Sequence, residues 1–138
     1  MDSQADTRLP VEQEAPGLRV YLLGPPVVQW AGRYLSIPRR QTRALLYHLA
    51  VHLLPLPREH LSCLFWPEMP ESDARRCLSH LLTHLRRALP APDVVLTGDD
   101  SVALDPRRVW SDTAAFEALL RTTRKPEHIE MGSLDRLD

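Results

Sequence analysis

Residues 72–89 carry the longest helical pattern in the chain, and this pattern constrains the fold more than any other feature. Apolar side chains recur there at helical spacing along one stripe, namely Ala74, Leu78, Leu81 or Leu82, Leu85 and Leu89. Ser72 can cap the start of the helix, and Pro90 and Pro92 end it. A helix of this length, about 27 Å at the usual rise per residue, must bury its apolar stripe and leave the opposite face free.

The free face of this helix is basic. Within residues 72–89, four arginines stand against a single acid, Asp73. The outward or flanking side chains are Arg75, Arg76, Ser79, His80, Thr83, His84, Arg86 and Arg87. Arginine donates to guanine edges or phosphates, and serine, threonine and neutral histidine pair with base edges in either direction. The pattern indicates DNA binding, although a merely solvated basic face explains the composition of this helix equally well.

Short β-prone runs and two further helices precede this segment. Residues 18–23, 27–30 and 34–37 are separated by turns rich in glycine and proline, and they predict a small antiparallel sheet. Apolar spacing then predicts helices over residues 40–52 and 58–65. The side chains expected to face inward are Leu45, Leu49 and either Leu46 or Val51 in the first helix, and Leu61, Leu64 and Phe65 in the second.

A β-hairpin over residues 94–104 and a last helix over residues 112–120 complete the pattern. The last helix carries the apolar side chains Phe116, Leu119 and Leu120, and Trp110 is placed to dock it. This order of elements predicts an α+β fold: a winged helix-turn-helix with an N-terminal small antiparallel sheet, three helices and a C-terminal β-hairpin wing. In such a fold the third helix enters the major groove and the hairpin flanks it.

The distribution of charge supports this interpretation better than the total does. A net charge of −1 argues against nucleic-acid binding. Residues 1–17 and 126–138, however, each hold four acids and one base, which leaves 15 bases and 10 acids in residues 18–125. Two cysteines are too few for a disulfide framework, and no signal sequence or apolar run of membrane length occurs. We therefore expect a cytoplasmic protein without a membrane segment.

Several runs together resemble a known family. They are Leu18-Arg19-Val20-Tyr21-Leu22-Leu23-Gly24, Ala44-Leu45-Leu46-Tyr47-His48-Leu49-Ala50, Arg58-Glu59-His60-Leu61 leading to Phe65-Trp66-Pro67, and Ala74-Arg75 leading to Leu85-Arg86-Arg87-Ala88-Leu89. In this order they resemble the N-terminal domain of Streptomyces antibiotic regulatory proteins, which are transcriptional activators, over residues 18–120. The resemblance implies an OmpR-type winged helix that binds double-stranded DNA at a tandem or direct-repeat operator. It also implies a dimer on DNA and RNA polymerase as a second partner.

The resemblance also assigns roles to residues. It makes residues 72–89 the recognition helix, in which Arg76, His80, Thr83 and His84 face the groove, while Arg86 and Arg87 contact the DNA backbone or bases. The corresponding wing, residues 94–104, departs from a DNA-binding pattern because Asp99 and Asp100 at its tip would repel phosphate. The resemblance therefore leaves phosphate contacts to Arg107 and Arg108, just after the hairpin.

The run Val109-Trp110-Ser111-Asp112, followed by Phe116-Glu117, resembles the join to the family's helical bacterial transcriptional activation module. Residues 1–17 are polar and acidic and contain Pro10, Pro16 and Gly17, so they predict a disordered leader. The resemblance then divides the rest of the chain into a winged-helix DNA-binding domain (18–110) and the start of a truncated activation module (111–138). These boundaries are expectations from the sequence alone.

Other chemistries have less support in the sequence. Cys77, His80 and His84 share a helix face, but a zinc site would need Cys63 or water as a further ligand, so we expect no metal. No phosphate-binding loop, nucleophile elbow or zinc-protease motif occurs, so we expect neither an enzyme nor a cofactor. The alternative is a protein-interaction module that docks RNA polymerase or another domain through the basic helix or through residues 67–72. Exposed leucine or tryptophan on that helix would favour this alternative.

Overall fold

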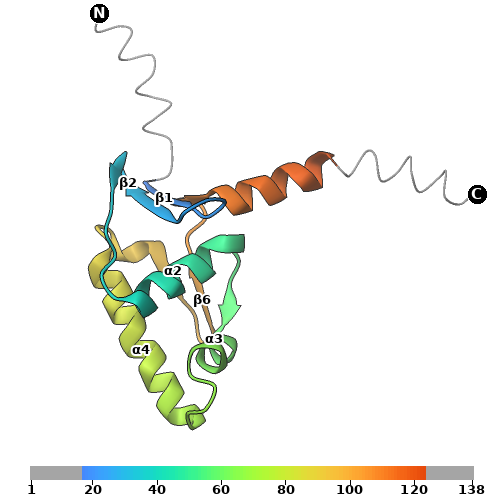
Figure 1. Ribbon diagram of the computed structural model, residues 1–138. Helices are drawn as coiled ribbons and strands as arrows, with labels where there is room; N and C mark the ends of the chain where they lie inside the picture. Colours follow the sequence, from blue (N-terminus) through green and yellow to red (C-terminus); the bar gives the residue numbers. More distant parts are fainter. Residues whose placement is uncertain (1–16, 124–138) are drawn as a thin grey trace, which may run out of the picture.

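Two small sheets and four α-helices make up an α+β fold over residues 17–123, the part of the chain that the computed structural model describes (Figure 1). The expected leader, apart from its last residue, and the last fifteen residues of the expected activation module lie outside the described residues. None of the helices within residues 17–123 is both long and apolar enough to cross a membrane.

The first sheet joins the start of the described chain to a strand near its end. Its order is β3 (Arg33–Tyr34), β2 (Val27–Trp30), β1 (Leu18–Tyr21) and β7 (Val109–Ser111). The predicted antiparallel pairs β1–β2 and β2–β3 are present, whereas β7 runs parallel to β1. The third strand is shorter than the predicted run 34–37, although Ile37 is still buried in the core.

The second sheet contains the hairpin that the sequence predicted. Its order is β4 (Leu56–Pro57), β6 (Ser101–Leu104) and β5 (Val95–Thr97), all antiparallel, with a 3₁₀ turn at Pro92–Val94 just before β5. The strand β4 was not predicted. Just after this strand, the Arg58 amide donates a hydrogen bond to the Asp100 carbonyl at the hairpin tip, at 2.8 Å.

The helices lie close to their predicted positions. They are α2 (Arg40–His52), α3 (Arg58–Phe65), α4 (Glu71–Ala88) and a last helix over residues 112–123. The long helix α4 therefore begins and ends one residue earlier than predicted. The prediction for α3 is wrong at Leu64, which is 49% exposed, because Ser62 takes the inward position beside Leu61.

The apolar stripe of α4 forms the centre of the core. All its predicted members are buried, including both Leu81 and Leu82, and α4 packs on α2 and α3. The sequence left open whether Leu46 or Val51 completes the buried stripe of α2. Leu46 does so, because it is fully buried, whereas Val51 is only partly buried. Trp110 packs on the first sheet: its ring lies edge-on to Tyr21 at 5.3 Å, under the Arg19 guanidinium. Its docking of the last helix stays a prediction.

Polar contacts fix the start of the last helix. The Ser111 hydroxyl donates to the Ala50 carbonyl at 2.6 Å and accepts the Ala114 amide at 3.1 Å, so it caps the helix. The Asp112 carboxylate accepts the amides of Leu22 and Leu23. The helix is therefore anchored at its first turn, beyond which it projects away from the two sheets (Figure 1).

Candidate nucleic-acid interface

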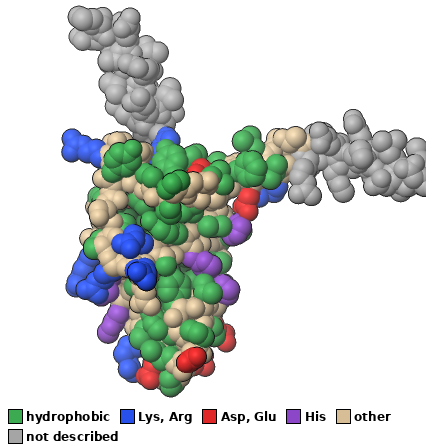
Figure 2. Space-filling view, viewed as in Figure 1, with side chains coloured by type: hydrophobic (Ala, Val, Ile, Leu, Met, Phe, Trp, Pro, Cys, Tyr) green, Lys and Arg blue, Asp and Glu red, His purple; other side chains and the backbone are tan. Residues whose placement is uncertain are grey.

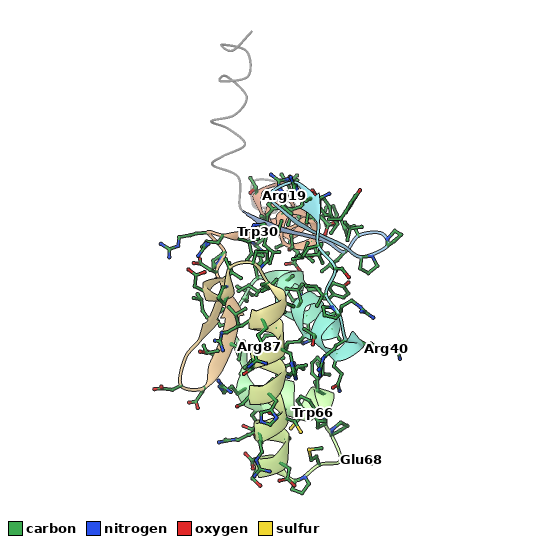
Figure 3. All side chains as sticks on the ribbon, turned by 90° about the vertical axis from the view of Figure 1, so that its left-hand side faces the viewer. Arg19, Trp30, Arg40, Trp66, Glu68 and Arg87 are labelled. Atoms are coloured by element: carbon green, nitrogen blue, oxygen red, sulfur yellow. The ribbon has the colours of Figure 1, made fainter. Side chains whose placement is uncertain are left out.

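The free face of α4 lies in the middle of one side of the molecule. In Figure 3, α4 runs down this side with the β5–β6 hairpin on its left and the start of α2, marked by Arg40, on its right. Six of the predicted α4 site residues are exposed, and His84 and Arg86 are half-buried; the exposed ones are Arg75, Arg76, Ser79, His80, Thr83 and Arg87. Arginines gather along this side of the molecule, at the left edge of Figure 2.

The two arginines near the start of α4 are only loosely paired. Arg75 lies 3.4 Å from Glu71 and Arg76 lies 3.5 Å from Asp73, and all four side chains are largely exposed. Ion pairs of this kind contribute at most about 1 kcal/mol, and the acids also suit the positive end of the helix dipole. Both guanidinium groups can therefore leave these carboxylates and pair with a more strongly binding anion with little loss of free energy.

The basic pair near the end of α4 divides into two roles. Arg86 turns toward the hairpin, where its guanidinium donates to the Thr97 hydroxyl at 3.1 Å and to the Val95 carbonyl at 3.4 Å. Arg87 is exposed on the face that Figure 3 displays. Arg86 thus holds the hairpin beside α4, while Arg87 is available to a ligand.

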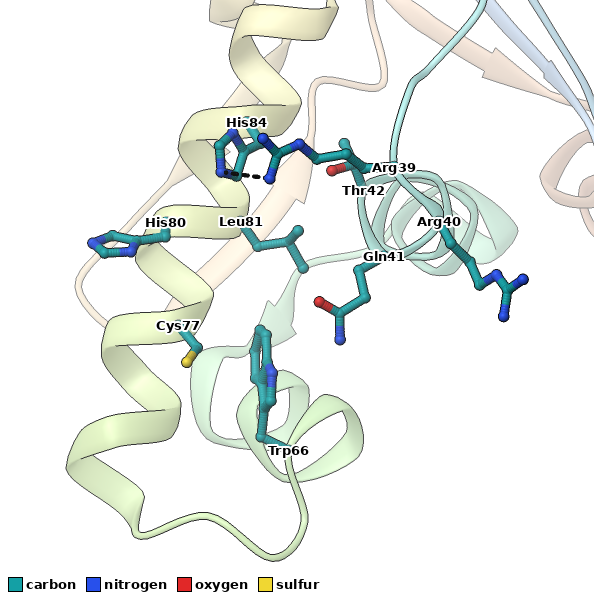
Figure 4. Close-up of a pocket in the computed structure, with 9 residues that line it drawn as sticks. All are labelled: Arg39, Arg40, Gln41, Thr42, Trp66, Cys77, His80, Leu81 and His84. Carbon is teal, nitrogen blue, oxygen red and sulfur yellow. Dashed lines mark hydrogen bonds between the residues drawn. The ribbon is translucent and has the colours of Figure 1, made fainter.

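His84 connects α4 to the start of α2. Its Nε2 atom lies 3.2 Å from the Arg39 guanidinium, as Figure 4 shows. Partial burial, followed by the charges of Arg39, Arg87 and His80, lowers the pKa of His84 below its usual 6.5. A lowered pKa favours the neutral imidazole, whose Nε2 atom accepts a hydrogen bond from the Arg39 guanidinium.

The start of α2 brings cations to this surface that the sequence analysis did not select. Arg39 and Arg40 are exposed there, and the first turn of α2 contains no acid. The signal in the sequence was the run Pro38-Arg39-Arg40, with Arg43 one turn later. Their significance depends on α2 packing beside α4, which is a tertiary contact that no local pattern displays.

The two arginines after the hairpin also differ from each other. The side chain of Arg107 is 88% exposed, with its Nε atom 3.4 Å from Asp105, whereas Arg108 is held by Asp93. Asp105 is buried, and its pKa is lowered chiefly by the hydrogen bond from the Arg107 amide. Of the two predicted phosphate contacts, Arg107 is the one that extends into solvent.

The thiol and imidazole groups of α4 do not gather around one point. The Cys77 thiol lies 3.6 Å from the Met69 sulfur, and Cys63 is exposed on α3. Within residues 17–123, no three histidine, cysteine, aspartate or glutamate side chains are arranged to hold a metal ion.

Comparison with known proteins adds no assignment: no protein-family model matches the chain, and no curated protein matches it. The fold and the surface of α4 therefore carry the functional argument. They define an α+β domain that presents a basic, polar helix face between a β-hairpin and the cationic start of a second helix.

Proposed function

We propose that this protein is a winged-helix domain that binds double-stranded DNA, with α4 in the major groove. The observation that carries the proposal is the exposed face of α4 between the hairpin and the start of α2 (Figure 3). The major groove is about 12 Å wide and accepts one helix, and α4, at about 27 Å, is long enough to cross it and cover both flanking backbones.

The proposal gives the charged and polar groups different roles. Arg76, His80, Thr83 and His84 lie along the part of α4 that would meet base edges, where they discriminate sequence. Arg75, Arg87 and Arg107 would contact phosphates and fix the register of the protein on the duplex. Arg86 and Arg108 act indirectly, because both are only partly exposed and are held by groups of the domain.

The distribution of exposed apolar side chains favours DNA over protein as the partner of α4. Among the described residues, none of the large exposed apolar side chains belongs to α4. A protein interface centred on α4 would need aromatic or aliphatic anchors at its middle. The charged and polar face instead matches the composition of a DNA-binding surface.

The biological role follows from the resemblance to Streptomyces antibiotic regulatory proteins. On that basis we propose a transcriptional activator that binds a direct-repeat operator as a dimer and contacts RNA polymerase. The loop between α3 and α4 suits the contact with polymerase, because Leu64 and Met69 are exposed beside Pro67. A small cleft of about 130 Å³ between α3 and α4 lies at the same place. Docking of a protein at this loop is the second candidate function.

The adjacent residues Arg86 and Arg87 provide a matched test. We expect Arg87→Ala to weaken binding of all duplexes and to reduce the slope of log affinity against log salt by about 1, with unfolding free energy changed by less than about 0.5 kcal/mol. We expect Arg86→Ala to lower the unfolding free energy by about 1 kcal/mol, because the hairpin loses two hydrogen bonds. Fluorescence anisotropy with a labelled duplex and urea denaturation measure the two quantities. If Arg86→Ala and Arg87→Ala lose affinity equally and Arg86→Ala loses no stability, this division of roles is refuted.

A further inference from the structure

An open cleft of about 460 Å³ separates the start of α2 from α4 (Figure 4). Arg39, Gln41 and Thr42 line it from α2, and His80 and His84 line it from α4, with Trp66 at the far end. The lining therefore includes two cations, because Arg40 also belongs to it, together with two histidines and polar side chains. Among the residues that the structure describes, no carboxylate lines the cleft.

The start of α2 is built without the usual N-terminal cap. Arg39 occupies the cap position with φ of 73°, in the left-handed region that favours glycine, and its side chain forms no capping hydrogen bond with the first turn. The first bond of the helix runs from the Arg43 amide to the Arg39 carbonyl at 3.1 Å. The amides of residues 40–42 therefore have no acceptor within the helix, and the helix dipole adds positive potential at this point.

A buried hydroxyl at the same place also has no partner. Thr42 is 1% exposed, and its Oγ1 atom has no hydrogen-bond partner within residues 17–123. It lies beside Arg39 on the wall of the cleft (Figure 4). Leaving a buried hydroxyl unpaired is costly, so a built-in donor of this kind points to a ligand that accepts from it.

We infer that this cleft binds one phosphate group of the DNA backbone. In this arrangement the phosphate oxygens accept from the amides at the start of α2 and from the Thr42 hydroxyl, while Arg39 supplies the charge. Arg39 lies beside Thr42, and its guanidinium is hydrogen-bonded to His84 at 3.2 Å. On DNA binding, Arg39 would give up this hydrogen bond to the imidazole and pair with the phosphate instead. The inference rests on the proposed function and names a phosphate contact outside the predicted set.

The test compares Thr42→Val with Thr42→Ser in duplex titrations. Valine has the shape of threonine without the hydroxyl, so we expect affinity for a duplex to fall about tenfold or more. Because the lost group is neutral, the slope of log affinity against log salt should stay unchanged. We expect Thr42→Ser to restore affinity to near the wild-type level. Ser62→Ala removes a buried hydroxyl on α3 that also has no partner among the described residues, and it should leave affinity unchanged.

The possible outcomes separate this inference from the proposed function. If the wild-type protein binds duplex DNA and Thr42→Val binds it equally well, the phosphate site is overturned and the DNA-binding proposal stands. If the wild-type protein binds no duplex at any salt concentration, both are overturned. Inorganic phosphate at matched ionic strength is the further control. If it raises the melting temperature of the protein at concentrations as low as those at which the duplex binds, the cleft is a site for a free anion and its assignment to DNA is overturned.

Discussion

Replacing Leu85 by alanine is expected to lower the free energy of unfolding by about 2–5 kcal/mol. Leu85 is fully buried and lies on the stripe of α4 that packs against α2. The truncation removes apolar contacts and leaves a cavity that the surrounding leucines cannot fully close. A loss of this size is a large fraction of the stability of a small domain. Urea denaturation followed by tryptophan fluorescence measures it.

Thr83→Ala is the matched control on the opposite face of the same helix. The Thr83 side chain is exposed and bonds only the carbonyl of Ser79 in its own helix. Alanine is also the better helix former, so we expect stability to change by less than about 0.5 kcal/mol. Similar losses for Leu85→Ala and Thr83→Ala would contradict the orientation of α4 on which the interface depends.

Arg76→Ala is expected to change which DNA sequences are bound, whereas Arg107→Ala should weaken all sequences alike. Arg76 is exposed on the part of α4 that we propose to enter the groove, and its pairing with Asp73 at 3.5 Å is weak. If Arg76 grips a guanine, its removal costs about 1–3 kcal/mol at that base pair and relaxes preference there. Arg107 is largely exposed in the turn after the hairpin, where we propose that it contacts phosphate.

Selection of bound duplexes from a random pool, followed by titration of the selected sequences, measures this difference. The wild-type protein should enrich a defined sequence, and Arg76→Ala should lose preference at one position of it. Arg107→Ala should enrich the same sequence at lower affinity. Identical behaviour of the two variants would contradict the assignment of base and phosphate contacts.

The features that the sequence predicted well are those encoded by local patterns. The stripe from Ala74 to Leu89 repeats at helical spacing, and every member of it is buried. The hairpin β5–β6 was predicted because its turn residues separate two short β-prone runs. Both signals depend on neighbours within a few residues, where sequence and structure are tightly linked.

The features that were missed depend on contacts between distant segments. The strand β7 exists because Val109–Ser111 pairs with β1 at the opposite end of the described chain. Arg86 turns to the hairpin because Thr97 lies beside it in the fold. Periodicity predicted which side chains of α4 leave the core, but not which partners they meet, and Arg39 joined the site only through the packing of α2 beside α4.

The affinity of the wild-type protein for a duplex as a function of salt concentration tests DNA binding by α4 most directly. The contacts proposed for Arg75, Arg87, Arg107 and the cleft at the start of α2 neutralise several phosphates. Each releases counterions, so log affinity should fall linearly with log salt with a slope between about −3 and −5. Binding with no dependence on salt, or no binding at low salt, would contradict the proposed function.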